Sequence, residues 1–237
     1  MQLFYAPNIQ KGELILDAVQ SKHCVKVLRH QEGSHIHLVD GLGGFYEAKI
    51  TDSNPKKCYF QIVKEQQKYG KMPFGLHIAI APTKNMSRFE WFLEKATEIG
   101  ITEITPLLTR YAERRNVRLE RLEKIVIAAM KQSLKAYKPI INNPLKIKDL
   151  CKKKEVLATY NFKAIAHLQA NTKPLQSIYQ KGQNALILIG PEGGFHADEI
   201  AMCLENGFAS ASLGKSRLRT ETAALVACHT VGLRNEI

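Results

Sequence analysis

The sequence lacks the features that would assign it to a membrane, secreted or disulfide-stabilised class. No run approaches about 18 consecutive apolar residues, so no helix is expected to span a membrane. The N-terminus has no basic stretch followed by an apolar stretch, so we expect no signal peptide and a cytoplasmic location. The five cysteines include no CxxC pair, which argues against a zinc ribbon and favours reduced thiols.

Several common catalytic and metal-binding motifs are also absent. The chain has no GxGxxG fingerprint, no HExxH pair and no GxSxG nucleophile elbow. The segment 213–216 resembles the end of a Walker A loop, but the first glycine of that motif would fall at Ala209. His35 and His37 share one strand face without a third ligand nearby, so no metal site is expected.

An excess of positive charge is the main compositional signal. The chain has 34 Lys and Arg against 22 Asp and Glu, a net charge of +12. Such a balance favours nucleic acid or an anionic surface as a partner. The segment 110–138 alone holds nine basic and three acidic residues. Its arginines form either a phosphate-contacting patch or a solvated helix face; they are Arg110, Arg114, Arg115, Arg118 and Arg121.

The first 72 residues are predicted to form a small β-barrel. Short apolar or alternating runs are typical of strands, and the segment 40–44 reads as a hairpin turn. Only residues 21–29 show helical spacing. The expected strands cover residues 13–17, 35–39, 45–50 and 58–63.

A change of pattern divides the chain. A polar segment with Gly70, Pro73 and Gly75 predicts a boundary, which gives domains at residues 1–72 and 73–237. In the second domain strands alternate with helices, which favours a mainly parallel sheet covered on both faces. Pro106 argues for a strand end or edge, and Trp91 and Phe92 are expected in the core. The expected strands are 76–81, 103–108, 156–160, 185–189 and 209–213, and the expected helices are 86–99, 119–134, 196–206 and 220–233.

Two loops near the C-terminus carry the functional signal. The segments 190–195 (GPEGGF) and 213–224 (LGKSRLRTETAA) each follow an apolar strand, where open α/β sheets bind ligands. The glycines of the first loop either admit a ligand close to the backbone or make a tight structural turn. In the second loop Thr220 is a possible helix cap, which leaves Arg219 unexplained. Together the loops indicate an enzyme with a bound small cofactor.

These motifs, in this order, resemble the RsmE family, the bacterial 16S rRNA uridine-N3 methyltransferases of the SPOUT superfamily. The chain departs from the family pattern at Lys131 and Lys135, where an acidic residue and an arginine are usual. The other segments that carry the resemblance are 23–29, Gly33, 39–41, Lys84, Arg88, Glu90, 94–100, Gln132, Ser133 and Pro139.

The resemblance implies a fold, a cofactor and partners. It implies an α/β protein, in which a PUA-like barrel precedes a SPOUT domain with a deep trefoil knot. It also implies S-adenosylmethionine bound in the knot, a homodimer joined through knot helices, and 16S rRNA or the small ribosomal subunit as substrate. The implied cofactor contacts are Ile189, Gly190, Glu192, Gly193, Leu213, Gly214, Leu218, Arg219, Thr220, Glu221 and Thr222.

Methylation of uracil N3 sets simple chemical demands. The N3 proton must leave, and the anion is delocalised onto two carbonyl oxygens, for which a guanidinium is well shaped. We therefore expect Arg219 to be the electrostatic partner of uracil, while Glu221 orients it or assists proton removal, unless water is the base. The flanking RNA is expected on the barrel and on basic residues, namely Arg29, Arg114, Arg115 and Arg118.

Two other interpretations remain open at this point. A related SPOUT methyltransferase would act on another RNA position, and a substrate assay that locates the methyl group distinguishes it. A non-catalytic rRNA-binding or ribosome-assembly protein would use the glycine loop only as structure, and cofactor binding distinguishes that one.

Overall fold

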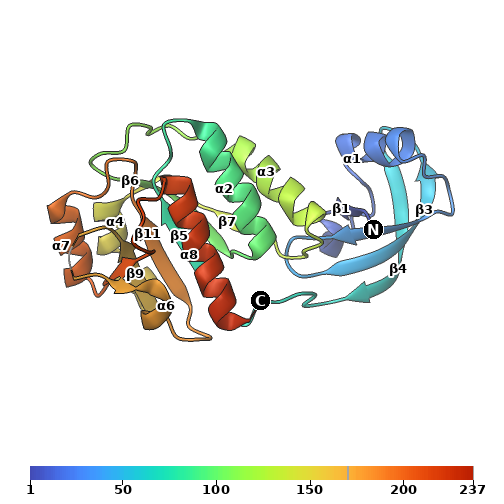
Figure 1. Ribbon diagram of the computed structural model, residues 1–237. Helices are drawn as coiled ribbons and strands as arrows, with labels where there is room; N and C mark the ends of the chain where they lie inside the picture. The colour runs from blue at the N-terminus through green and yellow to red at the C-terminus, as the bar shows by residue number, and fades with distance from the viewer. Residues whose placement is uncertain (170, 237) are drawn as a thin grey trace. The chain divides into compact units, whose positions relative to one another are not determined.

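Two units, each with its own apolar core, make up the computed structural model, which describes residues 1–169 and 171–236 (Figure 1). One unit comprises Met1–Lys71 and Ile127–Lys138, and the other comprises Met72–Val126 and Pro139–Ile237. The division into domains at residues 1–72 and 73–237 stays a prediction. It did not include residues 127–138 in the first unit, where the structure places them.

The first unit is built on a sheet with the strand order β1-β2-β3-β4. Strand β1 runs parallel to β2, and the β2–β3 and β3–β4 pairs are antiparallel. The predicted hairpin is confirmed, because β2 and β3 pair directly on either side of residues 40–44. The strands are Leu3–Tyr5 (β1), His35–Val39 (β2), Phe45–Ser53 (β3) and Cys58–Gln66 (β4).

The chain between β1 and β2 contains short helices. The strand predicted at residues 13–17 is wrong, since only Ile15 makes a bridge, to Tyr59. The reason is Asp17, whose carboxylate accepts the Gln20 N–H at 2.8 Å and starts a helix. The helices are Ile9–Lys11 (η1), Ala18–Lys22 (α1) and His23–Val27 (η2, a π-helix).

Residues 127–138 complete the core of the first unit. Met130 and Ala136 are buried with Leu3, Val39 and Phe45 in one apolar cluster. The backbone joins as well, because the Gly43 N–H donates to the Ala136 carbonyl at 3.0 Å. A segment distant in sequence therefore supplies part of this core.

The second unit contains a parallel sheet with the strand order β10-β12-β9-β11-β5-β6-β7, in which β8 also pairs with β6. The predicted α/β class with a mainly parallel sheet is confirmed. The strands are Leu76–Ile80 (β5), Glu103–Leu108 (β6), Ile140–Ile141 (β7), Leu145–Lys146 (β8), Phe162–Ala166 (β9), Lys173–Pro174 (β10), Ala185–Ile189 (β11) and Ala209–Ser212 (β12).

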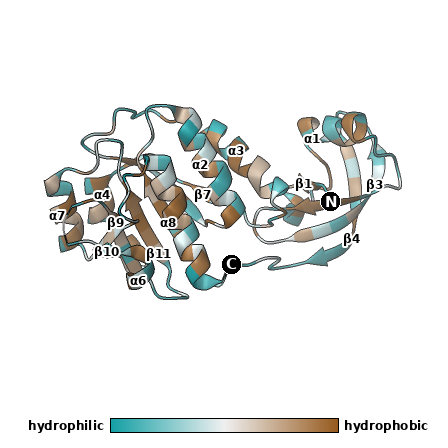
Figure 2. Cartoon of the chain, viewed as in Figure 1, coloured by the Kyte–Doolittle hydropathy of each residue, from teal (hydrophilic) through white to brown (hydrophobic). Residues whose placement is uncertain are grey.

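Helices cover both faces of this sheet, as Figure 1 shows. Apolar residues of α2, α3, α6 and α8 pack with Ile78 and Ile187 on one face, and those of α4, α5 and α7 pack with Ala79 and Leu188 on the other. The central strand β11 is hydrophobic throughout (Figure 2), and its neighbour β5 is buried along its whole length, because both faces of the sheet are covered. The helices are Met86–Ile99 (α2), Leu119–Gln132 (α3), Ile147–Lys152 (α4), Lys154–Ala158 (α5), Leu175–Ile178 (α6), Ala197–Glu205 (α7) and Thr220–Asn235 (α8).

Three expectations for this unit are wrong. Residues 156–160 are not a strand: Leu157 of α5 packs under the sheet, and the strand β9 follows it. Pro106 lies inside β6, at the point where the second neighbour of β6 changes from β7 to β8. Phe92 is fully buried as predicted, but Trp91 is 42% exposed. The trefoil knot stays a prediction.

No helix within residues 1–169 and 171–236 is both long and apolar enough to cross a membrane.

A buried polar network stands at the start of β5. The ring nitrogens of His77 lie 2.7 Å from the Tyr160 hydroxyl and 2.7 Å from the Thr105 hydroxyl. Tyr160 in turn donates to Glu103 at 3.1 Å. Burial lowers the pKa of His77 to about 4, although the Glu103 carboxylate opposes this shift.

We expect His77 to make stability depend on pH. Between pH 6.5 and pH 4 the unfolded chain binds a proton at this histidine that the folded chain does not, so the free energy of unfolding falls as pH falls. The full loss is about 3 kcal/mol. Urea unfolding at pH 7, 6, 5 and 4.5 should show a shallower pH dependence for His77→Gln than for the wild type. The exposed His229, changed to Gln, is the matched control, and equal slopes in both variants would contradict the assignment.

Candidate functional site

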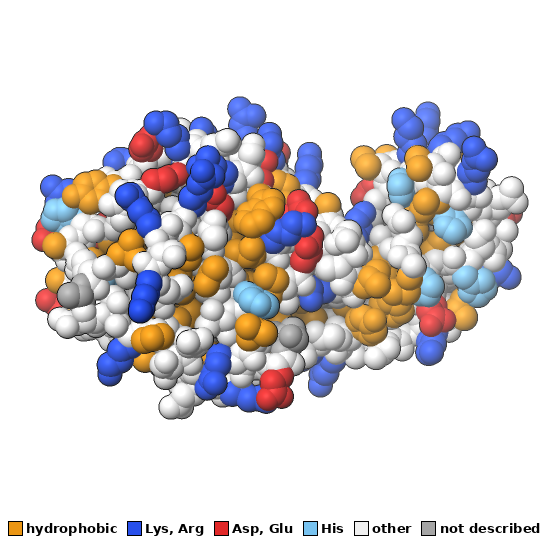
Figure 3. Space-filling view, in the orientation of Figure 1, with side chains coloured by type: hydrophobic (Ala, Val, Ile, Leu, Met, Phe, Trp, Pro, Cys, Tyr) orange, Lys and Arg blue, Asp and Glu red, His pale blue; other side chains and the backbone are white. Residues whose placement is uncertain are grey.

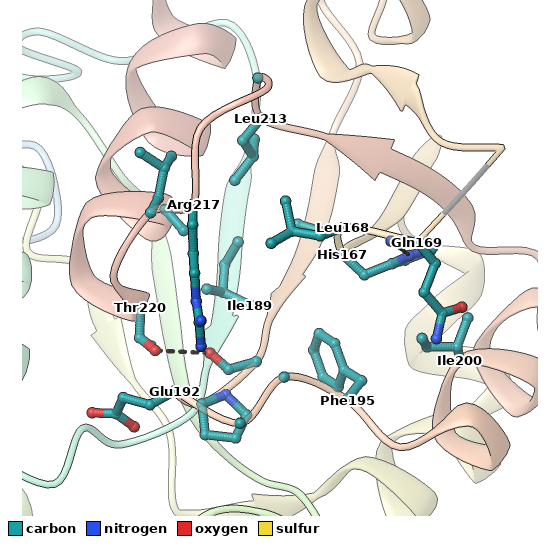
Figure 4. A pocket seen from close by; sticks show the side chains of 18 of the residues that line it. His167, Leu168, Gln169, Ile189, Glu192, Phe195, Ile200, Leu213, Arg217 and Thr220 are labelled. Atoms are coloured by element: carbon teal, nitrogen blue, oxygen red, sulfur yellow. Dashed lines mark hydrogen bonds between the residues drawn. The ribbon is translucent and has the colours of Figure 1, made fainter.

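A cavity of about 450 Å³ opens at the carboxyl ends of β9, β11 and β12. These strands are neighbours in the order β12-β9-β11, so the connections that follow them converge, as Figure 4 shows. The lining residues are Ala166, His167, Leu168, Gln169, Ile189, Gly190, Pro191, Glu192, Gly193, Gly194, Phe195, Ile200, Leu213, Gly214, Ser216, Arg217, Leu218, Thr220 and Ala223.

The glycines of the loop after β11 are required by close contacts. A Cβ on Gly190 would lie 3.1 Å from the Phe195 ring and 3.2 Å from the Gly194 backbone. Gly194 has a φ of 74° and donates its N–H to the Pro191 carbonyl at 2.8 Å, which closes a tight turn. The interpretation as a tight structural turn is confirmed, and close approach of a ligand to this loop, which lines the cavity, stays a prediction.

A hydrogen bond joins the two predicted loops. Thr220 is the first residue of α8, and its hydroxyl donates to the Gly190 carbonyl at 3.1 Å. It does not cap α8, because the N-cap position belongs to Arg219. The cap interpretation is therefore wrong, and the threonine instead holds the second loop against the first.

Most of the residues predicted to contact a cofactor line this cavity. Three of the predicted contacts lie outside the lining set: Arg219, Glu221 and Thr222. The lining segment 166–169 was not predicted from the sequence, because the strand β9 before it was not predicted. In the sheet, β9 lies between β11 and β12, and this places the segment between the two motif loops. The predicted contacts that do line the cavity are Ile189, Gly190, Glu192, Gly193, Leu213, Gly214, Leu218 and Thr220.

The two predicted catalytic residues have different surroundings. Glu221 is 6% exposed, and its carboxylate lies 3.8 Å from the Arg88 guanidinium of α2. Arg219 is exposed at the start of α8. A second arginine, Arg217, lines the cavity, and Figure 4 shows its side chain extending along the cavity toward Thr220. Spacing alone could not show which arginine of this loop points inward.

Two other polar side chains of the cavity, those of His167 and Glu192, already make hydrogen bonds. His167 lies 3.0 Å from the Ser210 hydroxyl through Nε2 and accepts the Gln169 N–H through Nδ1. Burial lowers the pKa of His167, so its ring is neutral at pH 7. Glu192 accepts the Lys84 N–H at 3.3 Å. Arg217 makes no hydrogen bond or ion pair with the described residues, and its charge is available to a ligand.

The predicted RNA contacts lie on the surface. Arg114, Arg115 and Arg118 are exposed in the connection between β6 and α3, and Arg29 is exposed in the first unit. Lys and Arg side chains are spread over the visible face of each unit (Figure 3). The proposed patch of arginines is partly neutralised, because Arg121 pairs with Glu90. In the described part of the chain, no cluster of three or more His, Cys, Asp or Glu residues could hold a metal ion.

Comparison with known sequences assigns the chain to a family. A family model described as an RNA methyltransferase domain matches residues 70–232, and one described as an RNA methyltransferase PUA domain matches residues 16–63. Ribosomal RNA small subunit methyltransferase E of Rickettsia conorii is 36% identical over 214 residues, which are 89% of this chain and 86% of that protein. The chain belongs to the ribosomal RNA small subunit methyltransferase E family.

Solved structures agree with membership of the methyltransferase E family. A probable rRNA-methyltransferase from Porphyromonas gingivalis is 39% identical, with a TM-score of 0.92 over 100% of this chain and 99% of that one. Ribosomal RNA small subunit methyltransferase E from Neisseria gonorrhoeae, bound to S-adenosyl methionine, is 27% identical, with a TM-score of 0.85 over 99% and 98%. The resemblance inferred from the motifs, including the PUA-like first domain, is confirmed.

Proposed function

We propose that this protein transfers the methyl group of S-adenosylmethionine to N3 of a uridine in 16S rRNA of the small ribosomal subunit. The observation that carries the proposal is the cavity at the ends of β9, β11 and β12, which the family's two motif loops line together. The Neisseria gonorrhoeae relative, which shares this fold, is bound to S-adenosyl methionine.

The residues of the cavity fit this cofactor. About 450 Å³ is within the range of small-molecule sites. Ile189, Leu213 and Leu218 offer apolar surface for the adenine ring, and the bare backbone at Gly190 and Gly193 offers polar groups at close range. When bound, the cofactor supplies an electrophilic methyl group.

The chain's own residues must hold the uridine and manage its charge. We assign Arg219 to the carbonyl oxygens of uracil, because it is exposed at the N-cap of α8, directly before Thr220 of the cavity wall. Such a guanidinium stabilises negative charge as the N3 proton leaves. Glu221 is held in place by Arg88, where it orients Arg219 or receives that proton.

We also propose that two copies associate through α2 and α8 and that the enzyme acts in the cytoplasm on rRNA or the small subunit. These helices pack side by side over the same face of the sheet (Figure 1), and Trp91 and Leu233 on them are 42% and 60% exposed. An interface on these helices would bury both side chains.

The first expectation concerns the cofactor. Titration calorimetry should show micromolar binding of S-adenosylmethionine to the wild type and at least tenfold weaker binding to Gly193→Val. A Cβ at Gly193 would lie 3.2 Å from the Tyr111 Cβ, so the larger valine must displace the loop that lines the cavity or the tyrosine against it. Gly193→Ala should fall between the two. A wild type that binds no cofactor, with or without RNA, would instead favour a non-catalytic rRNA-binding protein.

The second expectation separates the two arginines of the loop. Arg219→Ala should lower kcat for methyl transfer to 16S rRNA about 100-fold or more while the cofactor Kd stays near the wild-type value. Arg217→Ala is the matched variant, because it removes the same charge two residues away. If Arg217→Ala loses kcat and Arg219→Ala does not, the electrostatic role belongs to Arg217. Mass spectrometry of nuclease digests locates the methyl group, and any base other than N3-methyluridine refutes the proposed specificity.

The third expectation concerns the proposed dimer. Trp91→Glu should shift the sedimentation coefficient from that of a dimer to that of a monomer, since a buried carboxylate opposes association. Val63→Glu, at another exposed apolar residue, is the control. A wild type that sediments as a monomer at micromolar concentration would contradict the dimer.

A further inference from the structure

An exposed tyrosine lies directly against the glycine loop of the cavity. Tyr111 belongs to the connection between β6 and α3, and it is 47% exposed. Its Cβ is 3.2 Å from the position that a Cβ on Gly193 would occupy. Because Gly193 lines the cavity and Tyr111 does not, the tyrosine stands just outside the site, on the far side of its wall.

The chain at Tyr111 is fixed to the start of α7. The Arg110 N–H donates to Glu199 at 2.8 Å, and the Arg110 guanidinium contacts the His196 ring at 3.0 Å. The Tyr111 and His196 rings also meet, with centroids 5.9 Å apart. His196 and Glu199 themselves form the capping box of α7, so Tyr111 is anchored to a helix end while much of its ring faces solvent.

Basic residues near this tyrosine include two that are paired with carboxylates and two that form no ion pair with the described residues. The pairs are Lys84 with Glu113 and Arg110 with Asp198. Arg114 and Arg115 form no such pair, and they follow Tyr111 in the same exposed connection. Arg114 donates to the Lys84 carbonyl at 3.2 Å, and the Lys84 N–H reaches Glu192 of the cavity loop at 3.3 Å. The connections after β5, β6 and β11 are thus tied together around Gly193, and Tyr111, Arg114 and Arg115 are exposed on one of them.

We propose that Tyr111 is a stacking platform for a nucleobase of the RNA substrate, beside the nucleotide that enters the cavity, and that Arg114 and Arg115 contact the flanking phosphates. This inference rests on the proposed function. A base-modifying enzyme must hold its target out of the stack, which leaves neighbouring bases unstacked and in need of a new surface. Single-stranded RNA commonly finds that surface on tyrosine rings, next to arginines that hold the backbone. Tyr111 lies outside the buried apolar clusters of its unit, and its exposure leaves ring surface open to a base.

Stacking and phosphate contacts respond differently to salt, which provides the test. Phosphate contacts release counterions and set the slope of log Kd against log salt concentration, whereas stacking on a neutral ring does not. Binding of a 16S rRNA transcript should be measured from 50 to about 300 mM KCl for the wild type, Tyr111→Ala, Tyr111→Phe and Arg114→Ala. Val156→Ala, at a similarly exposed apolar residue of α5 in the same unit, is the control, because the flanking RNA is expected on the first unit and not on α5.

Tyr111→Ala should weaken RNA binding about tenfold or more at every salt concentration, with an unchanged slope and an unchanged Kd for S-adenosylmethionine. Tyr111→Phe should restore wild-type binding, because it keeps the ring, and Val156→Ala should have no effect. Arg114→Ala should lower the slope by about one.

Three outcomes would overturn the inference. If Tyr111→Ala binds RNA as tightly as the wild type, Tyr111 is not a stacking platform. If Tyr111→Phe does not restore binding, the effect belongs to the hydroxyl and not to the ring. An equal loss of cofactor affinity in Tyr111→Ala would make the tyrosine a structural support of Gly193. Failure of the proposed function is distinguishable from these outcomes, because in that case the wild type itself would not bind S-adenosylmethionine.

Discussion

The candidate site depends on the position of β9 between β11 and β12. Each of these strands pairs with β9 in parallel, although their sequences are separated by whole helices. Their carboxyl ends therefore meet at one edge of the sheet, and every connection that leaves that edge must pass over the same space. The bond from the Thr220 hydroxyl to the Gly190 carbonyl fixes the distance between two of these connections. Without β9 in the middle, the two motif loops would be separate turns.

Charge is distributed in a way that suits two different ligands. Within the cavity the His167 ring is neutral at pH 7 and the Glu192 carboxylate accepts a hydrogen bond, so the Arg217 guanidinium is the charge most available to a bound molecule among the described lining residues. Outside it, exposed arginines follow Tyr111 along the connection to α3. A small cofactor with its own charges and a polyanion can therefore occupy neighbouring surfaces without competing for the same side chains. The buried Glu221 adds no unpaired charge to the site, because its carboxylate pairs with the Arg88 guanidinium.

The sequence was most informative where local periodicity and motifs coincide. The helix at 86–99 was predicted to its ends, since its buried residues recur at helical spacing and Gly100 follows it. The GPEGG loop and the start of α8 were found from glycines and polar residues at strand ends. Contacts between distant segments were not predictable: the lining segment 166–169, the pairing of Glu221 with Arg88, and the inward direction of Arg217 all depend on which strands become neighbours.

The packing of residues 127–138 into the first unit has a consequence for biosynthesis. The chain leaves the ribosome from its N-terminus, so the strands of the first unit emerge long before Met130 and Ala136, which share a core with Leu3, Val39 and Phe45. Until residue 138 has emerged, that apolar surface is left without its cover and is a natural contact for a chaperone. The N-terminal unit is thus first in order of synthesis, but it is completed only when more than half of the protein has been made.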